Sequence, residues 1–494
     1  MKKTFYPFLA LAVGLLVAQA AASGLVFLSN RELWAKTQEL AGAGYLAIPN
    51  ELVRPLLLRA GAAARGAVFL TLSLGAGLSF LALVAAWAWD RLFSRNRAVL
   101  IGLAAAWASL PIGANLRGFE PVGTVLGLVV PPAVFFTAKV LMPRRERAGP
   151  VPAAAAFLVP LAVLALAWLS LAGKDVFLDI RDFVLWSSRP GRAVSDFYYH
   201  NTLYPAEMIK SLSQKTGRTC RTPSGGLDPR AESRLKNLLF HFDYLPLANP
   251  GPVDLELLFE QGSLVFRRQG REVMRAPWNA FTADPARHFK MFSEKTDNRF
   301  ILRRAILYSL MFPAPAALYL LFFSFLRGLA GMGLSPAGAR LAAGAACLAL
   351  GLLFLAPVAS GRATRTESLD RLLASGKWTD RVAGLRRVAR ENLEIENFPG
   401  YRKIMAGPGL PERYWLAAAL GRSKALSTRS DLLRMLGDPQ PNVVCQALDG
   451  LSRRRDPGAR EIILEKLRTS DHWYVQWYAY QALGSMGWTQ KPSS

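Results

Sequence analysis

Seven apolar runs dominate the sequence, and a long polar interval, Lys174–Arg299, separates the first five from the last two. A helix needs roughly 20 apolar residues to cross a hydrocarbon layer about 30 Å thick. The runs are Phe5–Ser29, Ala67–Trp89, Ala98–Asn115, Val122–Met142, Val151–Ala172, Ala305–Leu326 and Gly338–Ser360. This pattern predicts a multi-pass α-helical membrane protein with seven spans.

The predicted spans are rich in small residues and contain prolines. Gly75 and Gly77 lie in the second span, and the run Ala342–Ala346 lies in the seventh. Small residues let helices approach closely in a membrane, so tight packing is expected. The pairs Pro131–Pro132 and Pro313/Pro315 are expected to kink the fourth and sixth spans.

None of the seven runs contains Asp, Glu or His. Proton relays, ion-coupled pumps and intramembrane metalloproteases need ionisable groups or metal ligands at depth. The sequence therefore disfavours these classes.

The charges of the short loops predict the orientation of the chain. The amino terminus, Met1-Lys2-Lys3 followed by an apolar run and Ala18-Gln19-Ala20, resembles a secretory signal with a small-residue cleavage site. Because apolar character continues through Gly24–Leu28, an uncleaved signal anchor is favoured over a cleaved signal, and both place the next segment on the far side of the membrane. Eleven basic residues then fall on one side of the predicted membrane: Lys2, Lys3, Arg91, Arg95, Arg97, Lys139, Arg144, Arg145, Arg147, Arg327 and Arg340. The other side has Arg31, Lys36, Arg54, Arg59, Arg65 and Arg117. The positive-inside tendency makes the first side cytoplasmic and places both soluble blocks on the extracytoplasmic side of the inner cell membrane.

Four regions follow from this pattern. They are an N-terminal membrane bundle at 1–172, a small extramembrane α+β domain at 173–304, a two-span hairpin at 305–360 and an α-solenoid at 361–494. In the second region, Asp175–Trp186 has helical spacing of apolar residues and is expected to be an amphipathic helix near the membrane interface.

An unusual aromatic segment follows in the central block. If this segment is helical, Asp196 and His200 stand four residues apart on one face, as an acid/base or ligand pair requires. The alternative interpretation is that Tyr198, Tyr199 and Tyr204 pack at the membrane interface, with buried rings and wet hydroxyls. We favour the second interpretation, because a metal site needs three or four ligands and only one pair is present.

Further along, the apolar period changes from helical to alternating. Three short apolar runs between Val253 and Ala276 are separated by Gln261-Gly262 and Gln269-Gly270, which predicts an antiparallel meander. Phe240–Tyr244 also alternates, and His241 is expected to be an exposed strand residue.

The tail has a repeat of about 30 residues made of helical segments. Ala389, Leu420, Leu451 and Leu483 end successive apolar-periodic segments at spacings of 31 or 32 residues. Four residues, Val443, Ala447, Gly450 and Leu451, match Val475, Ala479, Ala482 and Leu483 at a constant offset of 32.

Asp471, Val475-Gln476, Ala479 and Ala482-Leu483-Gly484 resemble the second helix of short bacterial HEAT-like repeats, of the kind also found in phycobilisome-lyase-type proteins. The resemblance covers about residues 365–490 and fades in the first units. It implies a curved, right-handed stack of helix pairs that binds proteins or peptides. Lyase activity is not a property of the repeat and is not inferred. The aromatics Trp415, Trp473, Tyr474, Trp477 and Tyr478 form a binding face or fill the core between helix pairs.

Little in the sequence indicates catalysis or nucleic-acid binding. The chain has no Gly-x-Ser-x-Gly, Walker, His-Glu-x-x-His or Cys-x-x-Cys motif, and no cofactor or metal is expected. The net charge of +25 lies partly in membrane-flanking loops, and the tail has 22 basic against 14 acidic residues without a dense stripe, which disfavours nucleic acid. Cys220 and Cys445 leave one disulfide conceivable.

Three functions then compete. The first is a non-catalytic membrane scaffold or assembly subunit that binds partner proteins through the tail and the central domain, with membrane lipids around its spans. The second is a transporter or lipid-handling protein, and the third is an envelope enzyme with a site at the membrane surface. We favour the first, because large repeat surfaces without site chemistry usually bind other proteins.

Overall fold

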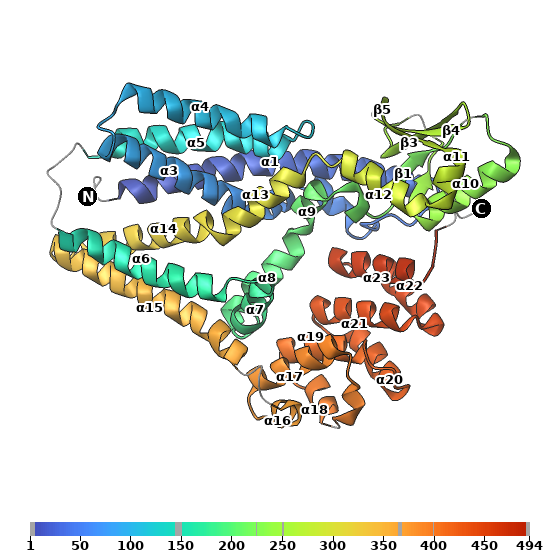
Figure 1. Cartoon of the computed structure of the whole chain (residues 1–494). Helices are drawn as coiled ribbons and strands as arrows, with labels where there is room; N and C mark the ends of the chain where they lie inside the picture. The colour runs from blue at the N-terminus through green and yellow to red at the C-terminus, as the bar shows by residue number, and fades with distance from the viewer. Residues whose placement is uncertain are drawn as a thin grey trace. The chain divides into compact units, whose positions relative to one another are not determined.

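The computed structural model describes residues 5–143, 151–223, 225–248, 251–363, 368–398 and 400–490 (Figure 1). Of the basic residues that predict the orientation, Lys2, Lys3, Arg144, Arg145 and Arg147 lie outside these ranges. The chain forms two compact units. We call Met1–Leu28, Ala60–Leu185 and Asn298–Ser360 the helical unit, and Ser29–Arg59, Trp186–Asp297 and Gly361–Ser494 the composite unit.

The helical unit is built from apolar helices. They are α1 (Tyr6–Gly42, which continues into the composite unit), α2 (Ala60–Leu70), the π-helix η2 (Thr71–Gly75), α3 (Ala76–Arg91), α4 (Arg97–Ala114), α5 (Pro121–Leu141), α6 (Val151–Leu171), α7 (Val176–Ile180), the π-helix η3 (Arg181–Leu185), α13 (Phe300–Met311), α14 (Pro313–Ala330) and α15 (Pro336–Ala363). Among the described residues, six helices are long and apolar enough to cross a membrane, or seven if α6 and the α7–η3 segment form one bent span. The predicted helical character of the seven runs is therefore confirmed.

Prolines act differently in the two predicted kinks. The sixth run divides at Phe312 into α13 and α14, because Pro313 and Pro315 lack the backbone N–H that would continue the helix. In contrast, α5 continues through Pro131 and Pro132 as one helix.

Small residues bring the apolar helices into close contact, as predicted. A methyl group built on Gly75 would lie 2.6 Å from the Ala18 side chain, and one on Gly77 would lie 2.0 Å from the Ser309 hydroxyl. A methyl group on Gly344 would lie 2.2 Å from the backbone oxygen of Ala156. At these three positions glycine is required by the approach of a neighbouring helix.

The segment predicted to be one amphipathic helix at Asp175–Trp186 is instead divided. Helix α7 gives way to the π-helix η3, and the axis of this segment lies at 109° to that of α6. The Asp182 carboxylate is fully buried and accepts a hydrogen bond from Arg181 at 2.8 Å. The periodicity is helical, but it does not reveal the π-helical turn.

The composite unit contains a five-stranded sheet within the described residues. Its strands are β1 (Arg218–Arg221), β2 (Tyr244–Pro246), β3 (Leu255–Glu260), β4 (Ser263–Arg268) and β5 (Arg271–Pro277), in the order β2-β1-β3-β4-β5. The predicted meander is confirmed, because β3, β4 and β5 pair antiparallel. Gln261-Gly262 and Gln269-Gly270 turn with positive φ at both residues, as tight hairpins require. The parallel pairs of β1 with β2 and β3 were not predicted.

The prediction that His241 is a strand residue is wrong. It is the last residue of α10 (Pro229–His241), and the strand begins only at Tyr244. The helix starts at Asp228, whose carboxylate accepts hydrogen bonds from the backbone N–H groups of Arg230 and Ala231. The apolar face of α10 is buried at Leu235 and Leu239. The capped helix therefore continues through Phe240 and His241, the first residues of the alternating pattern.

Further short helices complete this part of the composite unit, and of these α11 and α12 pack on the sheet. They are η1 (Arg54–Leu58), α8 (Arg189–Asn201), α9 (Leu203–Ile209), η4 (Leu212–Gln214), α11 (Trp278–Ala283) and α12 (Pro285–Lys295). Phe281 from α11 and Phe289 and Phe292 from α12 pack against Phe266 of β4. These aromatic rings form the centre of the domain core.

The tail folds into helix pairs. Its helices are α16 (Leu369–Ala374), α17 (Trp378–Glu391), η6 (Ile395–Asn397), α18 (Tyr401–Met405), α19 (Leu410–Leu420), α20 (Ser427–Arg434), η7 (Met435–Gly437), α21 (Pro441–Arg454), η8 (Pro457–Ala459), α22 (Arg460–Thr469) and α23 (Trp473–Ser485). Ala389, Leu420, Leu451 and Leu483 are all buried in the second helices of successive pairs. Leucine or alanine recurs every 31 or 32 residues because each of these helices packs against the next.

Candidate functional site

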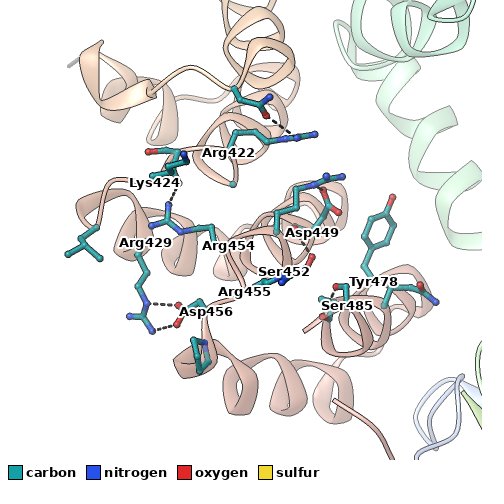
Figure 2. A pocket seen from close by; sticks show the side chains of 18 of the residues that line it. Arg422, Lys424, Arg429, Asp449, Ser452, Arg454, Arg455, Asp456, Tyr478 and Ser485 are labelled. Atoms are coloured by element: carbon teal, nitrogen blue, oxygen red, sulfur yellow. Dashed lines mark hydrogen bonds and ion pairs between the residues drawn. The ribbon is translucent and has the colours of Figure 1, made fainter. Parts of the chain in front are cut away.

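A groove lies where the carboxyl ends of α19 and α21 meet α23 and the loop before α20 (Figure 2). Its volume is about 1330 Å³. The residues that line it are Asn392, Gly421, Arg422, Ser423, Lys424, Leu426, Arg429, Asp449, Ser452, Arg453, Arg454, Arg455, Asp456, Pro457, Trp477, Tyr478, Gln481, Ala482 and Ser485. We call this feature the basic groove, because its lining has six basic and two acidic residues.

Two glycines set how closely the helices of the groove approach. A methyl group on Gly421 would lie 2.4 Å from the Cα of Gly450, and one on Gly450 would lie 2.9 Å from the Cα of Gly421. Only hydrogen atoms fit between these backbones. The carboxyl ends of α19 and α21 are therefore held together, and the basic residues that follow each helix converge.

Two of the six basic side chains are neutralised within the groove. Arg429 forms an ion pair with Asp456, and the Arg453 guanidinium lies 2.8 Å from the Asp449 carboxylate. Figure 2 shows the first of these pairs as dashed lines between the two side chains. The two carboxylates of the lining are thus already partnered.

Arg454 fixes the loop between α19 and α20. Its guanidinium donates hydrogen bonds to the backbone oxygens of Ser423 at 2.6 Å and Ala425 at 2.8 Å, and to the Thr428 hydroxyl at 2.8 Å. Backbone oxygens at the end of a helix carry partial negative charge and are stabilised by a cation. None of these acceptors is a carboxylate, so the positive charge of Arg454 remains in the groove wall.

The other three basic residues lie at the edge of the groove. Arg422 donates a hydrogen bond to the neutral side-chain oxygen of Asn392 at 3.0 Å. Within the described part of the chain, Lys424 Nζ and the Arg455 guanidinium form no ion pair. The nearby Glu394 carboxylate accepts hydrogen bonds from Ser423 and from the Lys424 backbone, and the Ser423 bond is the main cause of its lowered pKa.

The five tail aromatics lie in three different surroundings. Trp415 and Trp473 are buried and belong to the core between helices. Trp477 and Tyr478 are half-buried and line the basic groove. Tyr474 packs against Tyr199 with ring centroids 5.3 Å apart, and burial raises its pKa. Core filling is therefore the arrangement of Trp415 and Trp473, whereas Trp477 and Tyr478 remain partly exposed in the basic groove.

The aromatic segment of the central block contacts the tail. Rings of α8 and α9 lie against rings at the start of α23: His200 against His472 at 4.6 Å and Tyr204 against Trp473 at 5.2 Å. Tyr198 contacts Tyr199 on α8. The His200 ring nitrogen Nδ1 lies 2.8 Å from the backbone oxygen of Asp196, and both side chains are exposed. What the structure brings together here is an aromatic contact between two segments of the composite unit.

A second set of contacts fastens α23 and was not predicted from the sequence. Asn50 and Gln476 exchange hydrogen bonds of 2.8 and 2.9 Å, although 426 residues separate them. The Gln490 side chain accepts a hydrogen bond from the Leu46 backbone at 2.7 Å, and Tyr480 donates one to Asp243. No local motif marks Asn50 or Asp243, because each partner lies in a distant part of the sequence.

The described residues include no candidate metal site and no disulfide. No group of three or more His, Cys, Asp or Glu there lies close enough to hold a metal ion. Cys220, Cys347 and Cys445 are free and buried, and burial raises the thiol pKa of Cys220 and Cys445. A second cavity, of about 680 Å³, is lined by six residues of α10 and includes no acidic side chain.

Comparison with known proteins identifies one part of the chain. The HEAT-repeat family matches residues 410–484, which include α19, α21, all of α23 except Ser485, and most of the residues that line the basic groove. No curated protein and no solved structure matches the chain. HEAT repeats generally mediate contacts between proteins. The C-terminal region of this chain is therefore a HEAT-repeat region, as its residue pattern predicted.

Proposed function

We propose that this protein is a non-catalytic integral membrane scaffold or assembly subunit that binds a partner protein through its HEAT repeats. The observation that carries the proposal is the basic groove, which is the larger of the two cavities described above and lies on the repeats. Its lining combines unpaired cations with two half-buried aromatics. Arginine, tyrosine and tryptophan are the residues most enriched at protein interface hot spots.

Exposed apolar surface on the helical unit supports membrane insertion. Leu16, Ile101 and Leu166 are 69–70% exposed, and no residue of α4 is buried. An apolar surface this extensive is unfavourable in water, at roughly 25 cal/mol per Å². Lipid would cover it without cost.

The packing of the composite unit supports a common face for the soluble segments. If seven helices cross the membrane, Ser29–Arg59, Trp186–Asp297 and Gly361–Ser494 all emerge on the same side. These are the segments that form the composite unit. Contacts such as Lys36 with Asp254 at 2.6 Å and Asn50 with Gln476 require a common side. We propose that this side is extracytoplasmic, in line with the loop charges.

A transporter or lipid-handling role is the second candidate, and interrupted helices favour it. The π-helix η2 and the break at Phe312 interrupt two of the apolar runs, and the π-helix η3 follows the bend after α6. Transporters place their substrate sites at such interruptions. This role predicts that a solute or lipid binds next to these breaks and protects the neighbouring residues from chemical labelling. Substitutions in the tail should not change this protection.

Photo-crosslinking in intact cells tests the scaffold proposal. A photoreactive amino acid is placed singly at two exposed positions of the tail, Leu426 beside the basic groove and Ile462 on α22. A third site, Ser233 on α10, serves as a control outside the tail. A discrete protein adduct from either tail position and not from Ser233 is expected. If neither tail position gives a protein adduct, the scaffold proposal is wrong.

A further inference from the structure

We propose that the basic groove binds an acidic, extended segment of the partner protein that also carries an apolar side chain. The inference rests on the proposed function and adds the chemistry of the partner. Its elements are the unpaired cations of the lining, the fixed loop that presents them, and the aromatic wall opposite.

Charge complementarity identifies the occupant as acidic. After the internal pairs of Arg429 and Arg453 are discounted, four cations remain: Arg422, Lys424, Arg454 and Arg455. The groove's two carboxylates, Asp449 and Asp456, are used by those internal pairs. A recess lined by one sign of charge concentrates the potential and attracts the opposite charge. Arginine guanidinium groups also bind carboxylates through two parallel hydrogen bonds.

The cations come from different repeats, which explains why the sequence shows no dense basic stripe. Arg422 and Lys424 follow α19, whereas Arg454 and Arg455 end α21. About 30 residues separate the two sets in the chain. Stacking of the repeats, with Gly421 against Gly450, brings them to one groove.

The loop that carries the cations is ordered before any partner binds. Arg454 holds the backbone of Ser423 and Ala425, and Glu394 accepts a hydrogen bond from the Lys424 backbone at 2.9 Å. A binding surface that is already ordered loses less conformational entropy on association. Arg454 is therefore a positioning residue as well as a source of charge.

The apolar part of the lining calls for an apolar side chain in the partner segment. Leu426 is 85% exposed at the groove, and Trp477 and Tyr478 form part of the wall. Aromatic walls bury apolar side chains and keep their polar edges available. An acidic segment without an apolar residue would leave this surface wet.

A protein segment fits this site better than an anionic membrane surface. The cations line a recess of about 1330 Å³, whereas a bilayer presents a flat face. One of the four, Arg454, is held by backbone oxygens of the groove wall and does not extend outward. A chain that enters the groove reaches all four.

The test uses the full-length protein in detergent and a displayed library of random peptides. The test variant replaces Arg422, Lys424 and Arg455 by Glu. A charge-keeping variant carries Arg422→Lys, Lys424→Arg and Arg455→Lys. A matched control replaces Arg371, Lys403 and Arg468 by Glu, which changes the net charge equally at exposed tail positions outside the groove. Thermal unfolding establishes that each variant is folded.

Selected peptides are expected to be rich in Asp and Glu and to include an aromatic or aliphatic residue. The affinity of the best peptide, measured by fluorescence anisotropy, should fall by more than about tenfold in the test variant. It should fall less in the charge-keeping variant than in the test variant, because the charges remain while the paired guanidinium hydrogen bonds are lost, and it should change little in the matched control. Binding should weaken as salt is raised.

Three results would overturn the inference. They are a failure to enrich acidic peptides, equal losses in the test and control variants, and binding of short-chain phosphatidylglycerol at the groove in place of peptide. The crosslinks separate this failure from failure of the proposed function. A partner adduct at Leu426 that persists in the test variant, or an adduct at Ile462 alone, leaves the scaffold proposal standing and removes the acidic-segment inference.

Discussion

At the scale of single residues, Gly450 is a helix-interior position where the repeats leave no room for a side chain. A methyl group there would lie 2.9 Å from the Gly421 Cα and 3.2 Å from the Leu432 side chain. Alanine favours helices over glycine by about 1 kcal/mol. The backbone contact cannot yield as a side chain can, so overpacking, at about 1–3 kcal/mol, outweighs this gain. Gly450→Ala is therefore expected to lower the unfolding temperature of the tail, measured by calorimetry.

Gly484 on α23 supplies the matched control for this prediction. A methyl group on Gly484 meets no atom within 4 Å. Gly484→Ala should therefore leave stability unchanged or raise it by up to about 1 kcal/mol. If the two substitutions have the same sign, the close approach of α19 and α21 is not what requires glycine at position 450.

The imidazole of His472 is a buried base that should make the composite unit sensitive to acid. Burial, and secondly the nearby His200, lower the pKa of His472 from 6.5 to about 4. Neither ring nitrogen has a hydrogen-bond partner. Between these pH values the unfolded chain binds a proton that the folded chain does not. The contribution of neutral His472 to the free energy of unfolding is therefore fully present above pH 6.5. It is lost as the pH falls toward 4, by on the order of 3 kcal/mol.

Replacing His472 by Phe keeps a ring against His200 and removes the proton. Between pH 7 and pH 4.5, the unfolding temperature of the variant is expected to fall less than that of the unmodified chain. Thermal unfolding in detergent measures this difference. The change in stability with pH is measured for each protein separately and then compared between the proteins. Titrating groups that both proteins share therefore contribute equally and cancel. His241→Phe, at an exposed position on α10, is the control and should retain the full acid sensitivity. Parallel pH profiles for all three proteins would contradict the assignment.

At the scale of elements, the segment before η1 closes the end of the repeat stack. Asn50 donates hydrogen bonds to the backbone oxygens of Leu467, Arg468 and Ser470, and it exchanges bonds with Gln476. Terminal repeats need a polar cap, since no further repeat covers them. Here the cap comes from the other end of the chain.

Asn50→Ala is therefore expected to destabilise α22 and α23 specifically. The substitution removes the side-chain oxygen that accepts from the buried Gln476 Nε2 and the amide that donates to three backbone oxygens of the repeat end, and an unsatisfied buried polar group costs about 1–3 kcal/mol. Hydrogen exchange should accelerate in α23 more than in α17, which lies at the opposite end of the stack. Asn237→Ala, at an exposed position on α10, is the control. Uniform acceleration along the repeats would show that Asn50 does not act as a cap.

At the scale of the whole molecule, the parts that sequence predicts are those fixed by local periodicity. The apolar runs, the Gln-Gly hairpins and the spacing of Leu420, Leu451 and Leu483 each depend on neighbours within one or two turns or one repeat. The capping contact of Asn50 with Gln476 depends on residues 426 apart, and no pattern marks it. The groove lies between these cases, because its cations are visible in the sequence but converge only when the repeats stack.

The parity of the membrane crossings gives the final prediction. Single cysteines at Glu51, Ser233 and Leu426 sample the three segments of the composite unit, and Leu334 samples the loop between α14 and α15. The native cysteines are buried and contribute little background. With seven crossings, a membrane-impermeant maleimide added to intact cells should label the first three positions and not Leu334. Labelling of Leu334 alone would reverse the orientation. Labelling of Glu51 without Ser233 would mean that α6 and the α7–η3 segment do not complete a crossing, because three crossings, an odd number, would then lie between the two positions and place them on opposite faces.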